Sequence, residues 1–337
     1  MGGKVLIAGA RVGFWLALLV PAVAVAALLW YMIAMPGRSW SGALPALTDE
    51  DRRLAARLRE DVSAIASKPH HRWAPAELEA AATHIEARLR AAGHSVQREE
   101  FKAAGAAVRN LFAEVRGAQQ PGEIIIVGAH YDAVAGAPGA NDNGSGVAAV
   151  LELARVAREW RPDRTWRFAL FVNEEPPFYR TAEMGSHVHV EGIGARGERI
   201  VAMFSIETIG FYSEAPGSQH YPFPFSAFYP DRGDFLAFVG NLASRRLVHR
   251  TVATFRSAAQ FPSEGVAAPG WIAGVDWSDQ WAFWRAGVPA VMITDTALFR
   301  YPHYHTPRDT PDKVDYERLA RVVRELERTF RALDGAL

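Results

Sequence analysis

Residues 123–160, EIIIVGAHYDAVAGAPGANDNGSGVAAVLELARVAREW, contain the pattern that decides the fold. Residues 123–129 form a short apolar run, which is typical of a strand buried on both faces. A segment rich in Gly and Asn follows, and residues 144–160 then fit a helix. A strand, a loop and a helix in this order predict part of an α/β sheet.

The chain on either side of this stretch continues the alternation of strands and helices. We expect further helices at residues 48–67, 75–92, 242–256, 278–286 and 314–334, and strands at 94–101, 108–116, 165–172, 200–206, 235–239 and 289–294. This order predicts one α/β domain, residues 48–337, with a mainly parallel sheet covered by helices on both faces. Residues 211–233 and 258–277 are rich in Pro, Gly or aromatic residues and are expected to be loops.

Composition excludes several classes of protein. The 337 residues include 37 Lys or Arg and 37 Asp or Glu, so the net charge is zero and no basic surplus favours nucleic-acid binding. Hydrophobic residues make up 49%, which argues against a wholly disordered chain. The absence of Cys excludes disulfides, thiol nucleophiles and cysteine-ligated metals. Any metal site must use His, Asp and Glu.

The N-terminus carries a candidate membrane anchor. No charged residue occurs from Val12 to Met35, a run of 24 residues, and a bilayer core needs about 20 in a helix. Lys4 and Arg11 precede the run, which predicts a cytoplasmic N-terminus, residues 1–11, and an extracytoplasmic or periplasmic domain. Residues 36–47 are expected to be a linker. A cleaved signal peptide and a buried soluble helix are the alternatives.

Acidic and histidine side chains stand where the expected strands end or the helix begins. They are His130, Asp132, Asp142, Glu174, Glu175, Glu207 and His305. A single His after a strand is most often a solvated loop residue, but these seven residues fall in five separate segments, and five such placements favour a common site. Because loops beyond the strand ends carry the chemistry of such folds, we expect these side chains to converge at one sheet edge.

The residue types in this set favour metal-assisted hydrolysis. Histidines and carboxylates without Cys suit zinc. Two divalent ions about 3.5–4 Å apart need a shared carboxylate, and a spare carboxylate can act as general base toward water. The adjacent Glu174 and Glu175 can divide the tasks of base and ligand. The reaction expected from such a site is hydrolysis of an amide or ester.

Three segments together resemble a known family. The stretches HYDAVAGAPGANDNGSGVAAVLELAR (130–155), NEE (173–175) and YHTPRDTPDKVDY (304–316) are similar to the co-catalytic zinc aminopeptidases. That family includes bacterial leucyl aminopeptidases, aminopeptidase Y and glutamate carboxypeptidase, and glutaminyl cyclases are relatives. The resemblance covers most of residues 50–335. It implies a mixed, mostly parallel sheet sandwiched by helices, peptide substrates and two zinc ions.

The resemblance also implies a ligand set. His130 would bind one zinc, Asp142 would bridge both ions, and Glu175 and His305 would complete the second zinc. Glu207 stands where the family usually has Asp; its side chain is one methylene longer. It would complete the first zinc or weaken that site, so either two ions or one are expected.

Three further residues receive catalytic roles from the resemblance. Glu174 would be the general base, and Asp132 would lie behind His130 and orient its ring. Tyr304 would donate a hydrogen bond to the developing oxyanion. A second departure is Gln280, which stands where relatives often have His, next to Asp279, which would cap a helix or shape the site.

The other histidines are expected to have no part in the site. His187 and His189 are interpreted as a surface pair, and His70, His71 and His84 as exposed residues of the N-terminal helical region. His303 competes with His305 as the C-terminal ligand, and the Tyr-His-Thr context favours His305.

Three functions remain open at this point. The main hypothesis is a membrane-anchored zinc exopeptidase, an aminopeptidase acting on peptides. The second is a glutaminyl cyclase that uses one zinc, and the third is a non-catalytic zinc-binding module. The sequence leaves the residue preference and the oligomeric state open.

Overall fold

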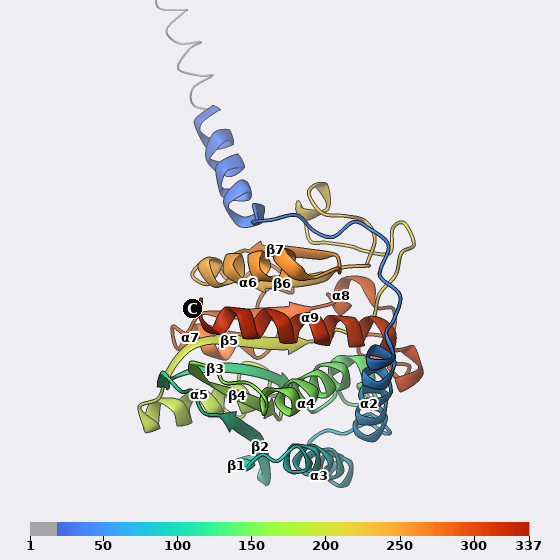
Figure 1. Cartoon of the computed structure of the whole chain (residues 1–337), viewed down its shortest axis with the longest axis vertical. Coiled ribbons are helices and arrows are strands. Elements are labelled where there is room, and N and C mark those ends of the chain that lie inside the picture. The colour runs from blue at the N-terminus through green and yellow to red at the C-terminus, as the bar shows by residue number, and fades with distance from the viewer. Residues whose placement is uncertain (1–18, 337) are drawn as a thin grey trace, which may run out of the picture.

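The computed structural model describes residues 19–336 and contains an eight-stranded mixed sheet between two layers of helices (Figure 1). The strands are β1 Gln97–Ala103, β2 Ala106–Val115, β3 Gln120–His130, β4 Arg164–Phe171, β5 Arg199–Glu207, β6 Leu236–Gly240, β7 Ser263–Ala267 and β8 Ala290–Thr294. The helices are α2 Asp49–Ile65, α3 Pro75–Ala91, α4 Gly146–Ala157, α5 Gly185–Arg196, α6 Arg245–Ala258, α7 Gln280–Arg285, α8 Ala297–Arg300 and α9 Tyr316–Asp334.

The sheet has a parallel centre and antiparallel pairings on either side of it. Its strand order is β1-β2-β4-β3-β5-β8-β6-β7, and β4, β3, β5 and β8 run parallel. Strands β1 and β2 pair antiparallel, as do β2 with β4 and β6 with β8. The predicted mixed α/β sheet flanked by helices is therefore confirmed.

One strand was missing from the sequence prediction. Residues 258–277 were expected to form a loop, but Ser263–Ala267 forms edge strand β7, which pairs parallel with β6. The strand has only five residues, SEGVA, and contains Ser, Glu and Gly, which are not typical strand residues. Its pairing with β6, not its local sequence, makes it a strand.

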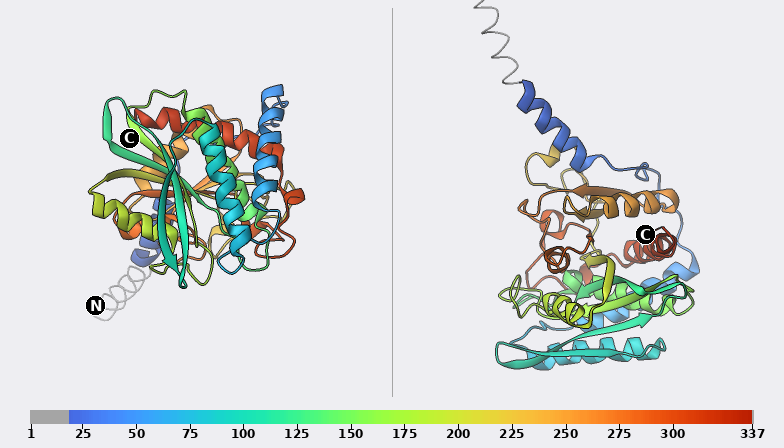
Figure 2. Two further views of the ribbon diagram at one scale, coloured as in Figure 1. Left: turned by 90° about the horizontal axis from the view of Figure 1, so that it is seen from below. Right: turned by 90° about the vertical axis from the view of Figure 1, so that its left-hand side faces the viewer.

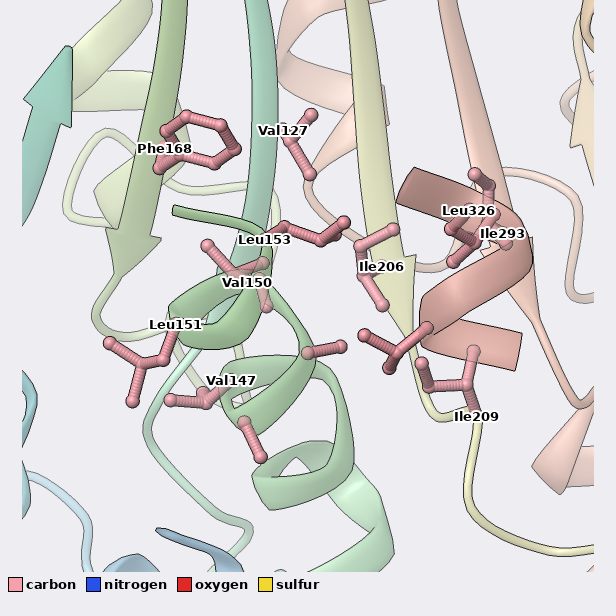
Figure 3. Packing of buried hydrophobic residues seen from close by; sticks show 14 of the residues in the cluster. Val127, Val147, Val150, Leu151, Leu153, Phe168, Ile206, Ile209, Ile293 and Leu326 are labelled. Carbon is pink, nitrogen blue, oxygen red and sulfur yellow. The ribbon is translucent and has the colours of Figure 1, made fainter. Parts of the chain in front are cut away.

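The apolar run of β3 is continuous because both faces of the strand are covered. Ile125 and Val127 belong to the main core with α2, α4 and α9, whereas Ile124 and Ile126 pack in a second cluster with α5 and α7. Figure 3 shows Val127 near Val150 of α4 on the first face. Full burial of such a side chain stabilises the fold by roughly 1.5–3 kcal/mol.

Helix α2 begins at the predicted Thr48 and is joined to α9. The Thr48 hydroxyl accepts a hydrogen bond from Asp51 N (3.1 Å), and the Asp51 carboxylate accepts one from Thr48 N (2.8 Å). This reciprocal cap satisfies two main-chain donors at the helix start. Asp51 is fully buried and forms an ion pair with Arg324 of α9 (2.5 Å), which holds the two helices together.

The described part of the N-terminal apolar run is helical. Residues 19–33 form a helix that projects from the domain (Figures 1 and 2). Within residues 19–336, no helix combines the length and the apolar character needed to cross a membrane. Residues 1–11, and residues 12–18 of the expected anchor, lie outside the described part of the chain.

Residues 36–47, expected to be a linker, lie against the domain. Arg256 of α6 donates to the carbonyl of Pro36 (3.2 Å), and Ser263 N of β7 donates to the Ser39 hydroxyl (2.8 Å). Arg321 of α9 donates to the carbonyl of Pro45 (2.6 Å). The segment is thus joined by hydrogen bonds to three elements of the domain.

Candidate metal centre

The parallel centre of the sheet brings the candidate ligands together. His130 and Glu207 are the last residues of β3 and β5, and Glu174 and Glu175 follow β4. Since β4, β3 and β5 are parallel neighbours, their carboxyl ends meet at one edge of the sheet. Asp142 lies in the turn before α4, and His305 lies in the loop between α8 and α9.

Within residues 19–336, two groups of three side chains are arranged to hold a metal ion, and Asp142 belongs to both. The first contains His130, Asp142 and Glu207, and the second contains Asp142, Glu175 and His305. The candidate ligand atoms of each group lie within 4.8 Å of one another.

The two oxygens of Asp142 face different histidines. Oδ1 lies 3.3 Å from Nε2 of His130, and Oδ2 lies 3.0 Å from Nε2 of His305. Glu207 Oε2 lies 3.2 Å from the same nitrogen of His130, and Glu175 Oε2 lies 3.4 Å from that of His305. A carboxylate between two histidines is the arrangement that two neighbouring divalent ions require.

The pKa values of the centre are shifted because several acidic groups are buried close together. Burial raises the pKa of Glu175 and of Glu207 to about 7 each. Burial lowers the pKa of His130, but Glu207 and Glu174 outweigh it and hold that pKa well above its ordinary value. Burial also lowers the pKa of His305, but Asp142 and Glu175 outweigh this effect and raise that pKa to about 11. A bound cation would balance this acidic charge.

Buried polar atoms without hydrogen-bond partners also fit a divalent ion at this centre. His130 Nε2 is buried and makes no hydrogen bond, although two carboxylate oxygens lie within 3.3 Å of it. Oε1 of Glu175 is also buried without a hydrogen-bond partner. Buried polar atoms are rarely left unsatisfied, so these atoms are consistent with ligation of an ion. The donor set of imidazole and carboxylate suits zinc.

Asp132 supports the centre mainly through the main chain. Its carbonyl lies 3.0 Å from Nδ1 of His130 and orients the ring, while its carboxylate lies 3.7 Å from the same nitrogen. The carboxylate accepts hydrogen bonds from the main-chain N–H groups of Glu174 (3.0 Å) and Glu175 (3.2 Å). Asp132 therefore connects the histidine ligand to the pair of glutamates.

Glu174 and Tyr304 lie beside the two groups without belonging to them. Glu174 Oε2 is 3.9 Å from Nε2 of His130, and burial, with help from Glu175 and Glu207, raises the pKa of Glu174 well above its ordinary value. The ring of Tyr304 stacks on that of His305, with ring centroids 3.9 Å apart. Burial also raises the pKa of Tyr304, which keeps its hydroxyl protonated.

Two supporting residues were missing from the sequence prediction. Asp309 is fully buried and accepts hydrogen bonds from the main-chain N–H groups of Asn141 (2.8 Å) and Asp142 (3.0 Å). The Ser278 hydroxyl donates to Oε2 of Glu207 (2.6 Å). The signal for Asp309 was its place four residues after His305, whereas Ser278 carried no recognisable signal.

The residues at the second sequence departure are buried. Asp279 stands at the N-cap position of α7, but its side chain makes no capping hydrogen bond, so the expected capping by its carboxylate is wrong. Burial raises its pKa to about 6. Gln280 donates a hydrogen bond to the carbonyl of Val275 (3.1 Å). Its amide therefore holds the preceding loop.

The expected exposure of two other histidines is also wrong. His189 is fully buried, and its Nδ1 lies 2.9 Å from Glu99, while its other nitrogen contacts Arg167. His70 is 1% exposed and contacts the carbonyl of Lys68. The partners of His189 are distant in sequence, and the partner of His70 lies in the adjacent turn. Helical spacing alone does not show either kind of partner.

A largely apolar cavity of about 110 Å³ adjoins the metal centre. Glu207 and Tyr304 belong to its wall. Most of the remaining wall comes from the loops at 211–233 and 268–277, from β6, β7 and β8, and from α8. Its apolar lining includes Tyr221, Phe225, Tyr229, Phe235, Ala237, Val239, Val266, Ile272, Val275, Met292 and Leu298.

The fold and this site define a class of protein. An α/β sheet whose strand ends carry two histidine–carboxylate groups with one shared aspartate is suited to metal-dependent hydrolysis. The profile of peptidase family M28 matches residues 110–329, more than half of the chain. The chain therefore belongs to peptidase family M28 and is a metallopeptidase, and the resemblance seen in its sequence is confirmed.

Relatives in sequence agree with this assignment. The uncharacterized protein YfbL of Escherichia coli (strain K12) is 37% identical over 296 residues, which cover 84% of this chain and 89% of that protein. A probable zinc metalloprotease of Pyricularia oryzae is 35% identical over 115 residues, but these cover only 27% of this chain and 23% of that protein.

Solved structures share the fold. An aminopeptidase from Aneurinibacillus sp. strain AM-1 aligns with a TM-score of 0.62 at 18% identity, covering 83% of this chain and 94% of that one. A glutaminyl cyclase from Fimbriiglobus ruber aligns with a TM-score of 0.61 at 20% identity, covering 88% and 99%. At these identities the similarity establishes the fold alone.

Proposed function

We propose that the protein is a zinc aminopeptidase that removes N-terminal residues from peptides. The observation that carries the proposal is the position of Asp142 between two metal-binding groups, with Glu174 free beside them. His130, Asp142 and Glu207 would hold one zinc, and Asp142, Glu175 and His305 would hold the other. Bound zinc lowers the pKa of water and polarises a carbonyl group.

Glu174 is proposed as the general base. Its carboxylate accepts a proton from the attacking water and passes it to the leaving amine. Burial raises its pKa above the ordinary value of a glutamate, which makes the carboxylate a stronger base toward water. Tyr304 keeps its hydroxyl protonated and donates a hydrogen bond to the oxyanion that develops on the scissile carbonyl. Asp132 positions Glu174 through the hydrogen bond to its main-chain N–H.

The cavity next to Glu207 and Tyr304 supports a substrate preference. Its walls are mainly aromatic and aliphatic, so a large apolar N-terminal side chain would be favoured. Leucyl or phenylalanyl p-nitroanilide should therefore be cleaved at least about tenfold faster, as kcat/KM, than the glycyl compound. Equal rates for the three compounds would contradict this assignment of the cavity.

The mechanism is tested by Glu174→Gln. The variant should keep the zinc content of the wild type and lose about 10²–10⁴-fold in kcat, because only the general base is removed. The matched control is Glu159→Gln, at an exposed position, which should leave both quantities unchanged. Near-normal turnover by Glu174→Gln with a full zinc complement would show that Glu174 is not the base.

A glutaminyl cyclase is the second candidate, because Glu207 at the usual Asp position leaves room for a site with one zinc. A cyclase releases ammonia from N-terminal glutamine and cleaves no peptide bond. Products from glutaminyl peptides therefore separate the two functions on the same purified sample. Ammonia without free amino acids, together with one zinc per chain, would favour the cyclase.

We also propose that residues 12–35 anchor the chain in a membrane, with the catalytic domain outside the cytoplasm. The uncharged run and the apolar helix at residues 19–33 support this proposal. After expression in bacteria, the full-length chain should remain in membranes washed with alkaline carbonate. A chain that is released, or that mass spectrometry shows to be shortened at its N-terminus, would contradict the anchor.

A further inference from the structure

Two strongly exposed aromatic side chains lie in the two loops that contact the N-terminal helix. Phe223 is 93% exposed and lies in the loop that precedes β6, and Trp271 is 84% exposed and lies in the loop after β7. The neighbouring Phe228 is 48% exposed. Exposed aromatic rings on neighbouring loops can mark a contact surface.

The N-terminal helix packs against the same two loops. Met32 is 4% exposed and belongs to one apolar cluster with Phe225 and Val275, and Tyr221 and Ile272 pack against this cluster. Figures 1 and 2 both show the helix leaving the domain next to the loop of residues 221–229. The loops that carry the exposed rings are therefore packed against the helix.

The end of the helix is attached to the domain by further contacts. Arg245 of α6 donates a hydrogen bond to the carbonyl of Tyr31 (2.7 Å), and its guanidinium lies 4.1 Å from the centre of the Tyr31 ring. Leu29 and Ile33 also pack against the cluster that contains Met32. Because the helix is held by packing and polar contacts, a bilayer that contains it would face a defined end of the domain.

We propose that Phe223, Phe228 and Trp271 form a second membrane contact, in the interfacial layer of the bilayer that holds the N-terminal helix. This proposal rests on the anchor proposed above, but it adds a surface of the catalytic domain to it. Aromatic side chains, Trp above all, are favoured at the membrane–water interface because their rings suit its mixed polarity.

The same surface borders the mouth of the apolar cavity. Trp277 and Leu298, which are 43% and 38% exposed, belong to the cavity wall. In that wall, Tyr221 lies two positions before Phe223 in the sequence, and Ile272 directly follows Trp271. The contact would therefore place the entrance of the cavity close to the bilayer surface.

The absence of Cys allows a direct test on the full-length chain. Phe223→Cys and Trp271→Cys variants would each carry a nitrobenzoxadiazole label, in vesicles of phosphatidylethanolamine and phosphatidylglycerol that contain nitroxide-labelled lipid. The matched control is Lys102→Cys, an exposed position on β1, at the opposite edge of the sheet from β7. None of the three positions belongs to the metal centre or the cavity wall.

The expected result is lipid quenching several-fold stronger at positions 223 and 271 than at position 102. Equal, weak quenching at all three positions in vesicles that do carry the protein would overturn the second contact and leave the anchor intact. Failure of the full-length chain to float with the vesicles would overturn both. Peptidase activity measured in the same vesicles is independent of these outcomes, so a failed enzyme assignment is distinguishable.

Discussion

The two halves of the metal centre are built in different ways. In the first half, His130 and Glu207 are the final residues of neighbouring strands, and the side chain of His130 is 1% exposed. In the second half, His305 lies in a loop with a φ of 55°, and its side chain is 34% exposed. The sheet therefore fixes one half, whereas the other depends on the loop between α8 and α9.

Each half also has its own support. Ser278 donates to Glu207 in the first half, where the side chain is longer than the usual aspartate. Asp309 accepts two main-chain hydrogen bonds from the turn that carries Asp142, and so joins this turn to the loop of His305. In the first half, a single hydroxyl group orients a ligand that the sheet already positions. In the second half, a buried carboxylate holds the turn and the loop together.

Asp142→Asn should have the largest effect, because it alters the one ligand that both halves share. The amide keeps the size of the side chain but loses the charge that attracts both cations. We expect zinc content to fall in both halves and kcat/KM to fall on the order of 10³-fold, since a metal contributes several kcal/mol. Elemental analysis and peptide hydrolysis would measure this. Two tightly held zinc ions in this variant would argue against a bridging role.

His130→Ala and His305→Ala should separate the halves. Each variant removes one ligand that belongs to a single group, so each is expected to retain about one zinc per chain. His130→Ala should also lower the thermal stability of the metal-free protein more than His305→Ala does, because the ring of His130 is fully buried. If either variant lost both ions, or neither, the division into two groups would be wrong.

Ser278→Ala should weaken the first half only. Removal of a residue that orients a metal ligand typically costs 10–100-fold in affinity, so we expect a loss of about that size for one of the two ions. Competition with a chelator would measure both affinities. Ser257→Ala, at an exposed position of α6, is the matched control. A uniform loss at both ions would mean that Ser278 acts on the whole fold instead.

Asp309→Asn should have the smallest effect on activity. An amide oxygen is a weaker acceptor than a carboxylate, and its NH₂ group cannot accept the second main-chain hydrogen bond. We expect a loss of about 1–3 kcal/mol in the free energy of unfolding and a smaller, roughly tenfold, loss in kcat/KM. Urea unfolding with zinc present and absent would measure this. Asp312→Asn is the exposed control, and equal stability of the two variants would contradict the role.

The sequence predicted the halves unequally well. His130 and Glu207 follow apolar strands, so their convergence followed from the topology of a parallel sheet. His305 was placed in the same set because it follows the expected strand at 289–294, but the choice of His305 over His303 needed the Tyr-His-Thr context, because a loop of this kind has no periodic signal. Ser278 and Asp309 were not predicted as supports, since their partners lie 71 and 167 residues away along the chain.

The sequence by itself determined the alternation of strands and helices, the mixed α/β class, the family and the set of candidate ligands. These properties depend on local apolar patterns and on residue types, which are readable along the chain. The tertiary structure alone decided the strand β7, the burial of His189, the apolar cavity and the packing of Met32 against the loops around Phe225 and Val275. Each of these depends on which distant segments meet, and packing between distant segments leaves no mark in local spacing.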